Sequence, residues 1–277
     1  MRSPVIAPPE LLDATATAAP RDIATVRRAG AVAPLRSVCE SILFCGLIAG
    51  FGLASLTWSL CAGLLYWLLP RRLGEPLGQF VIMAGFRGFV AAMRASGILD
   101  CELKELDRLA RGAPVVIAPN HPSLLDAVLV ISRLPQVVCA AKAPIWNNAF
   151  LGGGARLAGF IRNDSPAKLI RGAVRQLQAG RHFLIFPEGT RTDGTPVGAF
   201  KGGFALIAKR AAVPVQAVFI ETDSPFLRKG WPLFRKPPFP LVYRARLGRR
   251  ITVTGDPRAA VAELRAYYRQ ELGTGDR

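Results

Sequence analysis

The chain has 277 residues, of which 51% are apolar, and its mean hydropathy of +0.28 is high for a soluble enzyme. Lysine and arginine outnumber aspartate and glutamate by 36 to 19, and the net charge of +17 favours polyanionic partners: anionic lipid head groups, phosphorylated substrates, coenzyme A, acidic carrier proteins or nucleic acid. An odd number of cysteines without CxxC spacing argues against a disulfide framework and a zinc site, and indicates a reducing compartment for Cys39, Cys45, Cys61, Cys101 and Cys139.

The N-terminal part of the chain predicts a tail followed by a membrane element. Residues 1–37 are rich in Ala, Pro and Arg without a continuous apolar run, so we predict a disordered tail and no cleavable signal peptide. From Ser41 to Leu69, 29 residues carry no charge, more than the about 20 that one span needs. Either a tilted span or a helical hairpin broken at Gly50-Phe51-Gly52 fits this length. Arginines on both flanks resist translocation, which favours the hairpin with both ends in the cytoplasm.

A second helix is predicted from Pro76 to Gly97, and it completes a helical region over residues 38–97. Its apolar positions repeat at helical spacing, with Arg87 and Arg94 as its charges. Such a helix lies at a membrane interface or packs against the core of the following domain, and the pattern favours neither. The apolar positions are Phe80, Met83, Ala84, Phe86, Phe89, Val90 and Met93.

Residues 98–277 alternate between strand and helix signals. Strands are predicted at Val115–Ala118, Val137–Ala141, Phe183–Phe186 and Val215–Ile220. Helices are predicted at Ser123–Ser132, from the N-cap Ser165 to Gly180, and at Gly203–Ala211. Because apolar strands separated by helices are typical of sheets buried on both faces, we expect an α/β domain with a mostly parallel sheet flanked by helices.

The segment after the fourth strand departs from this alternation. Ser224–Pro240 contains five prolines, four aromatic residues and four basic residues, which predicts a long ordered loop beside the sheet. This composition suits a membrane surface or the edge of a substrate site, and an ordinary solvated loop fits it as well. Two late strands, Leu241–Leu247 and Ile251–Thr254, and a helix capped by Asp256 and Pro257 are expected to follow.

Candidate catalytic residues follow the first strand, in Asn120-His121-Pro122-Ser123-Leu124-Leu125-Asp126. His121 comes at the carboxyl end of a strand, where open α/β sheets bind ligands. A carboxylate that accepts from the Nδ1–H of His121 fixes the tautomer and leaves the other ring nitrogen as a base. Asp126 falls in the first turn of the predicted helix, near enough for this role. Ser123-x-x-Asp126 is also a capping-box pattern, so Asp126 has a purely structural alternative.

A second motif, Phe186-Pro187-Glu188-Gly189-Thr190-Arg191, ends the third strand and predicts an anion-binding turn. Gly189 permits a turn that exposes backbone N–H groups, and Arg191 can hold a phosphate through two hydrogen bonds. Glu188 is expected to anchor that arginine or to bind a substrate hydroxyl; a strand-ending turn with a surface ion pair is the alternative. Lys201, just before a predicted helix, is either a further phosphate ligand or a solvated lysine.

The two motifs, in this order and about 60 residues apart, resemble motifs I (HxxxxD) and III (FPEGTR) of the membrane-bound glycerolipid and lysophospholipid acyltransferases. The resemblance covers roughly residues 115–220. It implies that Arg162 is the acceptor-binding arginine of motif II and that Val213–Val218 is motif IV. Ala217 stands where the family usually has a second proline, and Pro122 where many relatives carry a polar residue, so the acceptor stays open.

The resemblance implies an α/β acyltransferase preceded by a membrane-embedded hairpin or span. His121 is then the base and Asp126 its orienting carboxylate. The implied reaction moves a fatty acyl group from acyl-CoA or acyl carrier protein to a lysophospholipid hydroxyl, by default from lysophosphatidate to phosphatidate in phospholipid biosynthesis. No other cofactor, metal or nucleic acid is implied, and the implied location is a membrane, the inner one of a bacterium, with the catalytic domain in the cytoplasm. The implied substrate-binding residues are Arg162, Glu188, Gly189, Thr190, Arg191 and Lys201.

Several alternatives stay open at this point. The acceptor can instead be a lyso-aminolipid or a specialised membrane lipid or pigment. Transfer to water would make the chain an acyl hydrolase, and a basic membrane-surface scaffold is the non-enzyme alternative. Other chemistries find little support, because the sequence has no GxSxG nucleophile elbow and no P-loop, and His182 has no clustered ligands for a metal.

Overall fold

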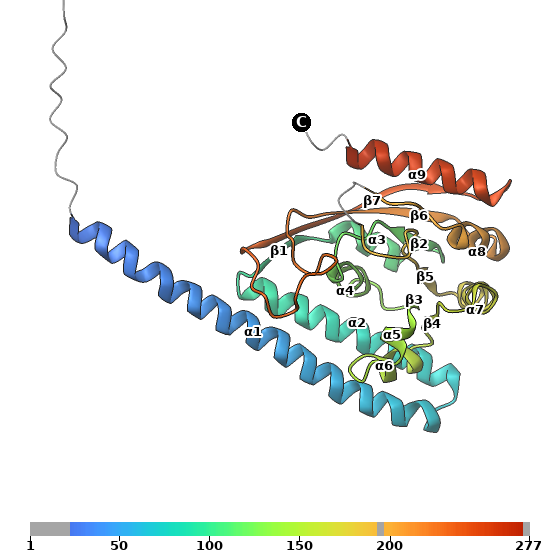
Figure 1. Cartoon of the computed structure of the whole chain (residues 1–277). Helices are drawn as coiled ribbons and strands as arrows, with labels where there is room; N and C mark the ends of the chain where they lie inside the picture. Colours follow the sequence, from blue (N-terminus) through green and yellow to red (C-terminus); the bar gives the residue numbers. More distant parts are fainter. Residues whose placement is uncertain (1–22, 193–196, 274–277) are drawn as a thin grey trace, which may run out of the picture. The chain divides into compact units, whose positions relative to one another are not determined.

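The computed structural model describes residues 23–192 and 197–273 (Figure 1). The chain divides into two units, Met1–Ser41 and Ile42–Arg277, and the sheet and every candidate site residue belong to the second. Helix α1 (Ile23–Leu68) begins in the first unit. Of the predicted disordered tail, residues 1–22 lie outside the described part. Residues 23–37 are helical, in contrast to the prediction, and their alanines and arginines are strong helix formers.

Helix α1 runs without interruption through Gly50-Phe51-Gly52, so the break predicted there is wrong. Each glycine costs a helix about 1 kcal/mol, but Phe51 between them packs against the next helix, α2 (Arg71–Ala95), with its ring 4.2 Å from that of Phe89. The chain turns instead at Pro70, since a residue before proline disfavours helical geometry. The helical pair therefore consists of α1 and α2 (Figure 1).

Both helices carry apolar surface that the protein leaves exposed. By length and composition, the segments Leu35–Leu68 and Arg71–Ala95 can each cross a membrane. In α1, Trp67 is 85% exposed and Leu60 and Leu64 are also exposed, which indicates membrane association. Helix α2 combines the two predicted roles: Phe80 is exposed, whereas its other face packs in the core through the buried residues Met83, Phe89, Val90 and Met93.

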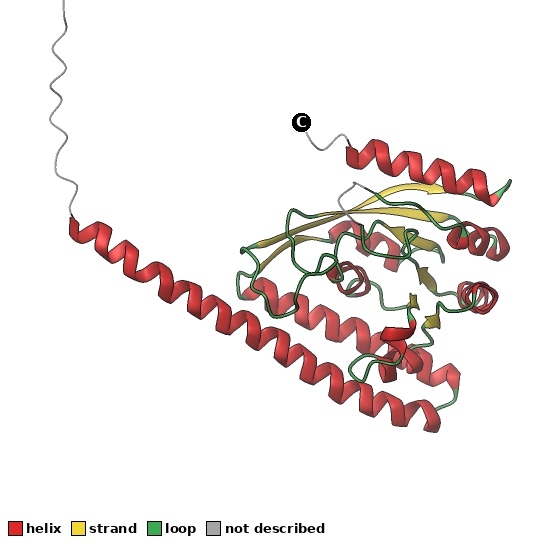
Figure 2. Ribbon diagram, viewed as in Figure 1, coloured by secondary structure: helices red, strands yellow, loops and turns green. Residues whose placement is uncertain are grey.

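The described residues form a seven-stranded sheet in the order β1-β7-β6-β2-β5-β3-β4 (Figures 1 and 2). Neighbours from β6 to β4 pair in parallel, which confirms the mostly parallel sheet, whereas β7 runs antiparallel to β6 and parallel to β1. The strands are β1 (Leu99–Glu102), β2 (Val116–Pro119), β3 (Val137–Ala141), β4 (Ile161–Arg162), β5 (His182–Leu184), β6 (Val215–Glu221) and β7 (Leu241–Ile251).

Of the two late strands predicted, the first is found as β7, which continues through Ile251, and the second, Ile251–Thr254, does not form beyond Ile251. The sequence suggested a break because Gly248, Arg249 and Arg250 follow each other between apolar residues. In the structure, Gly248 continues the strand at a close approach, where a Cβ atom would lie 2.6 Å from the ring of Phe219. The glycine therefore marks tight packing of β7 on β6 and not the end of a strand.

Helices cover both faces of the sheet (Figure 2). Alternate residues in and just before β2 join two cores. Val115 and Ile117 pack with α2 and α4 (Leu125–Ile131), and Val116 and Ala118 pack with α7 (Pro166–Gln178), α8 (Gly203–Ala211) and α9 (Pro257–Gly273). This two-sided burial explains the continuous apolar strands. The other helices after α2 are α3 (Asp107–Ala110), which follows the short 3-10 helix Lys104–Leu106, α5 (Ala143–Trp146) and α6 (Gly152–Leu157).

The loop between β6 and β7 is ordered and ties the sheet to α1. Phe226 is fully buried, with its ring 5.4 Å from that of Phe44 in α1. Phe239, near the end of the loop, lies 5.6 Å from the same Phe44 ring. Phe234 between them is 58% exposed. The loop thus has a buried side that faces α1 and an exposed apolar tip.

Candidate active site

The two sequence motifs meet at the carboxyl ends of neighbouring parallel strands. His121 follows β2 by two residues, and Phe186-Pro187-Glu188-Gly189-Thr190-Arg191 follows β5. The Thr192 N–H donates to the carbonyl oxygen of His121 at 2.8 Å, and the His121 N–H donates to Oε1 of Glu188 at 3.2 Å. These bonds join the two segments into one site at the edge of the sheet where α/β folds bind ligands.

His121 and Asp126 form a hydrogen-bonded pair. Nδ1 of His121 lies 2.9 Å from Oδ2 of Asp126, and the histidine side chain is 12% exposed whereas the aspartate is fully buried. The same Oδ2 accepts from the Ser123 N–H at 2.7 Å, at the start of α4. Both predicted roles of Asp126 therefore hold together: it binds the backbone at the helix start, and it orients the imidazole. With Nδ1 engaged, Nε2 is the ring nitrogen left for a substrate.

The ionisation of Asp126 is set by two opposing effects. Burial raises the pKa of Asp126 to about 6, while the hydrogen bonds from His121 and from the Ser123 N–H act to lower it. Oδ1 of Asp126 has no hydrogen-bond partner among the described residues. The carboxylate is thus ionised at neutral pH, where it can accept the Nδ1–H of His121, and it takes up a proton in mildly acidic solution.

Two further residues of the motifs shape the site in ways that sequence reasoning did not assign. The Phe186 ring stacks on the His121 imidazole, with centroids 3.8 Å apart and planes 19° apart. The buried amide of Asn120 donates to the carbonyl oxygen of Ile220 at 2.8 Å and accepts from the N–H of the same residue at 2.7 Å. Asn120 thereby ties β2 to β6. The sequence feature that could have identified Asn120 is a polar residue directly after a buried strand.

Glu188 binds two backbone N–H groups and one side-chain hydroxyl, and not an arginine. Its Oε1 accepts from the His121 N–H and from the Thr192 hydroxyl at 2.8 Å, and its Oε2 accepts from the Gly198 N–H at 2.8 Å. Gly198 is needed at this contact, because a Cβ atom there would lie 2.7 Å from Oε2. Neither predicted partner of Glu188, Arg191 or a substrate hydroxyl, explains these three bonds. The residue holds the turn after β5 against His121.

We expect Glu188→Gln to destabilise the protein by about 2–3 kcal/mol, because either orientation of the amide points its NH2 group at a buried backbone N–H. Denaturant unfolding in detergent, followed by tryptophan fluorescence, measures this loss. Glu221→Gln is the matched control, since Glu221 is exposed and paired with Arg246 at the surface, and we expect less than about 1 kcal/mol. Equal unfolding midpoints for the two variants would contradict this role of Glu188.

The remaining residues of the second motif gather on one side of His121. Arg191 donates through Nη1 to the carbonyl oxygens of Leu227 and Arg228, at 2.9 and 3.0 Å, in the loop after β6. Gly189 has a φ of +66°, and its N–H closes the turn onto the carbonyl oxygen of Phe186 at 3.0 Å. A Cβ atom at Gly189 would lie 2.9 Å from Nζ of Lys201. Lys201 and Thr190 are exposed. A basic surface thus borders the turn.

Arg162 lies apart from this group. It ends β4, and the strand register places it level with Pro119 of β2. Three strand spacings of about 4.8 Å separate β2 from β4, or about 14 Å across the sheet. Its guanidinium forms an ion pair with Asp164 at 2.7 Å and lines a different cavity. The structure therefore brings together the predicted residues at 121, 126, 188–191 and 201, but not Arg162.

The other histidine and the cysteines have structural surroundings. His182 is buried at the start of β5, where Nδ1 accepts from the Val115 N–H at 3.3 Å. Cys101 and Cys139 are buried in strands, and burial raises the pKa of both thiols. Within residues 23–192 and 197–273, no cluster of three or more His, Cys, Asp or Glu side chains is placed to hold a metal ion.

Comparison with known proteins gives consistent matches. The acyltransferase family model matches residues 100–221. The chain is 33% identical over 199 residues to lyso-ornithine lipid O-acyltransferase of Pseudomonas aeruginosa, across 68% of this chain and 70% of that protein. It is 30% identical over 149 residues to human 1-acyl-sn-glycerol-3-phosphate acyltransferase beta, across 50% of this chain and 52% of that protein. The crystal structure of the 1-acyl-sn-glycerophosphate (LPA) acyltransferase PlsC from Thermotoga maritima superposes with a TM-score of 0.63 at 20% identity, across 87% of this chain and 95% of that chain.

These matches bear on fold and family in different ways. The Thermotoga structure shares the fold. The chain spans about half the length of the human relative. The match to the Pseudomonas protein extends over more than two thirds of both chains, and the family model ends at Glu221 after including both motifs. The chain therefore belongs to the acyltransferase family.

Proposed function

We propose that this acyltransferase moves a fatty acyl group from an acyl thioester to the hydroxyl of a lysophospholipid, with lysophosphatidate as the default acceptor. The hydrogen bond between Nδ1 of His121 and Oδ2 of Asp126, at the open end of β2, carries the proposal. It is the geometry of an oriented general base, and His121 is hydrogen-bonded to Glu188 and Thr192 of the segment that carries Arg191. The names of the human and Thermotoga relatives support this acceptor.

The proposed reaction is direct transfer without an acyl-enzyme intermediate. Nε2 of His121 takes the proton of the acceptor hydroxyl as that oxygen attacks the thioester carbonyl carbon. Asp126 stabilises the imidazolium that forms, and a positioned acid–base pair contributes typically about 10²–10⁴-fold. The carbon–sulfur bond then breaks, and the thiolate leaves and takes the proton from His121. The products are an ester and a free thiol, so atoms and charges balance and no further cofactor enters.

The residues best suited to bind the acceptor phosphate lie in the second motif and beside it. Arg191 uses Nη1 for two backbone carbonyls of the loop after β6, which fixes the guanidinium and leaves its other N–H groups for a phosphate. Lys201 lies against Gly189 and can add a second positive charge. Thr190, exposed between them, completes the proposed acceptor site, while Glu188 holds the turn in place.

The names of two relatives favour a second candidate acceptor. The Pseudomonas relative is named as a lyso-ornithine lipid O-acyltransferase, and a Rhodobacter capsulatus protein of the same name is 30% identical over 151 residues. Such an aminolipid acceptor keeps the same catalytic pair and changes only the head group beside Arg191. Lyso-ornithine lipid is therefore the second candidate acceptor.

The exposed apolar faces of α1 and α2 support a reaction at a membrane. We propose that the catalytic domain, residues 98–277, faces the cytoplasm at the inner membrane of a bacterium, with residues 38–97 as the membrane-associated region. Arg71 and Arg72 begin α2, which packs on the catalytic domain, and their resistance to translocation supports that orientation.

The experiment compares the amount of thioester consumed with the amount of ester formed. Purified protein in mixed micelles receives labelled acyl-CoA or acyl carrier protein with lysophosphatidate, lyso-ornithine lipid or no acceptor. We expect loss of thioester to equal the gain of ester with one of the two acceptors. Thioester loss that yields only free fatty acid would show a hydrolase. No turnover with any donor and acceptor would favour the scaffold alternative.

A further inference from the structure

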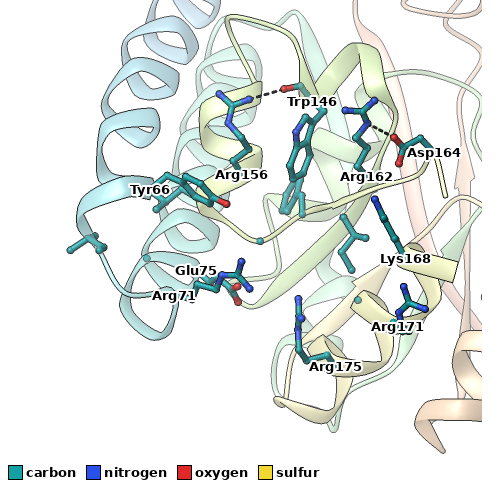
Figure 3. A pocket seen from close by; sticks show the side chains of 17 residues that line it. Tyr66, Arg71, Glu75, Trp146, Arg156, Arg162, Asp164, Lys168, Arg171 and Arg175 are labelled. Atoms are coloured by element: carbon teal, nitrogen blue, oxygen red, sulfur yellow. Dashed lines mark hydrogen bonds and ion pairs between the residues drawn. The ribbon is translucent and has the colours of Figure 1, made fainter. Parts of the chain in front are cut away.

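A basic cavity of about 450 Å³ lies beside the far edge of the sheet, away from His121 (Figure 3). Its walls come from the end of α1, the start of α2, α5, α6, β4 and α7. Six cationic side chains and two acidic ones line it. The cations are Arg71, Arg156, Arg162, Lys168, Arg171 and Arg175, and the acids are Glu75 and Asp164.

Most of this positive charge is uncompensated. Glu75 forms an ion pair with Arg181, and Asp164 with Arg162. In the part of the chain that the structure describes, Arg71, Lys168, Arg171 and Arg175 form no ion pair, although Glu75 lies beside Arg71 (Figure 3). The three cations of α7 are also exposed to solvent, so the cavity is reachable from water. A site of this kind suits a ligand with several phosphate charges.

Aromatic rings share the cavity with these cations. Trp146 reaches into the same space as Lys168 and Arg175, and Tyr66 borders it from α1 (Figure 3). The carbonyl oxygen of Trp146 accepts from Nη1 of Arg156 at 3.0 Å, which holds that turn in place. Planar rings beside arginines favour a flat heterocycle that can stack. Phosphates together with a heterocycle indicate a nucleotide.

The distance to the catalytic pair selects between the two substrates of the proposed reaction. Arg162 lies about 14 Å across the sheet from the end of β2, which precedes His121. In lysophosphatidate about four bonds join the reacting hydroxyl to phosphorus, or roughly 5 Å at about 1.2 Å per bond of an extended chain. In acyl-CoA about thirteen bonds join the thioester sulfur to the first phosphorus, or roughly 16 Å. The backbone separation of about 14 Å therefore matches the reach of the donor better than that of the acceptor.

We propose that the cavity binds the phosphorylated adenosine end of acyl-CoA, which rests on the proposed function and names its donor. Arg162 and the cations of α7 hold the phosphates, and Trp146 lies against the adenine. The pantetheine arm runs along the carboxyl ends of β3 and β5 to His121. Donor and acceptor phosphates are thus held on opposite sides of the catalytic pair, with Arg162 on the donor side and Arg191 on the acceptor side.

The test reverses two exposed charges of the cavity, in Arg171→Glu/Arg175→Glu. The matched control is Arg258→Glu/Arg269→Glu, which reverses two exposed charges of α9, outside the cavity. We expect the KM for acyl-CoA to rise at least about tenfold in the cavity variant, because charged hydrogen bonds to phosphate are lost. The kcat at saturating donor, the KM for the acceptor and the behaviour of the control variant should stay within about twofold of wild type.

A donor without the nucleotide makes the test specific. With an acyl thioester of pantetheine, the wild type and the cavity variant should transfer at equal rates, because this donor has no phosphate for the cavity to bind. An unchanged KM for acyl-CoA would overturn the proposal, including the case in which only the KM for acyl carrier protein rises. A rise in the KM for the acceptor would assign the cavity to the acceptor phosphate instead. Loss of binding to anionic vesicles with unchanged donor kinetics would assign it to a lipid head group.

Direct binding separates this proposal from the proposed function. Isothermal titration of coenzyme A into wild type, the cavity variant and the α9 control needs no turnover. Binding that weakens at least about tenfold in the cavity variant alone supports the site even if no acceptor is ever acylated. Equal affinity of all three proteins, or no binding to wild type, would overturn the site even if acyl transfer is observed.

Discussion

His121→Ala should lower the rate of acyl transfer by about 10²–10⁴-fold and leave the protein folded and membrane-bound. The expected loss is that of a general base held in place, because no other side chain of the site offers an unprotonated nitrogen to the acceptor hydroxyl. The change removes the hydrogen bond from Nδ1 to the fully buried Asp126, so stability should fall by about 1–3 kcal/mol while the fold is kept. Turnover at saturating donor and acceptor measures the effect, and circular dichroism with vesicle flotation checks fold and membrane binding.

His182→Gln is the matched control for this prediction. His182 is the other histidine of the chain, and its Nδ1 accepts from the Val115 N–H, a role that an amide oxygen can take over. We expect this variant to keep transfer activity. If His121→Ala retains wild-type turnover, or if His182→Gln loses as much turnover as His121→Ala, then His121 is not the base.

Asp126→Asn should also lower the transfer rate by about two to four orders of magnitude, and it should change the pH dependence. Burial raises the pKa of Asp126 to about 6, and a protonated Asp126 lacks the negative charge that stabilises the imidazolium of His121. The wild-type rate should therefore decline as the pH falls through about 6. The variant should lack the part of this decline that belongs to Asp126. A pH–rate profile of kcat/KM for both proteins measures this, and an identical acid limb in the two would contradict it.

Ionisation of Asp126 supports catalysis, but it lowers the stability of the folded protein. Because the folded pKa of about 6 lies above the ordinary value of 3.8, protonation of Asp126 favours the folded state. Its stabilising contribution is complete below about pH 4 and is lost as the pH rises through about 6. The side-chain amide of the Asp126→Asn variant cannot titrate, so the wild type should lose stability relative to this variant between these pH values. Denaturant midpoints at pH 4.5 and 7.5 give the comparison, and a constant difference between the two proteins would contradict it.

Sequence patterns predicted the sheet well because each central strand is apolar on both faces. The helix α7 was predicted equally well, since Ser165 caps it and Pro166 begins it. The patterns failed where a glycine had a use other than ending an element. Gly50 and Gly52 lie within α1 beside the packed ring of Phe51, and Gly248 lies in β7 against Phe219. Only the tertiary contact decides between these uses of glycine.

The candidate site was predictable where residues are close in sequence or end neighbouring strands. His121 and Asp126 are five positions apart, and the second motif meets them because β5 pairs with β2. Two roles depended on strand order and loop contacts, which no local pattern encodes. Glu188 binds the backbone N–H groups of His121 and Gly198, the second of them beyond the motif, and the hydroxyl of Thr192. Arg162 is separated from the pair by two intervening strands.

The most direct measurement is a structure of the protein with lysophosphatidate bound and no donor present. The account predicts that the acceptor hydroxyl lies about 2.6–3.2 Å from Nε2 of His121, the distance of a hydrogen bond to a general base. It also predicts that the phosphate contacts Arg191 and Lys201. An acceptor whose hydroxyl points away from the imidazole, or whose phosphate lies beside Arg162, would contradict it.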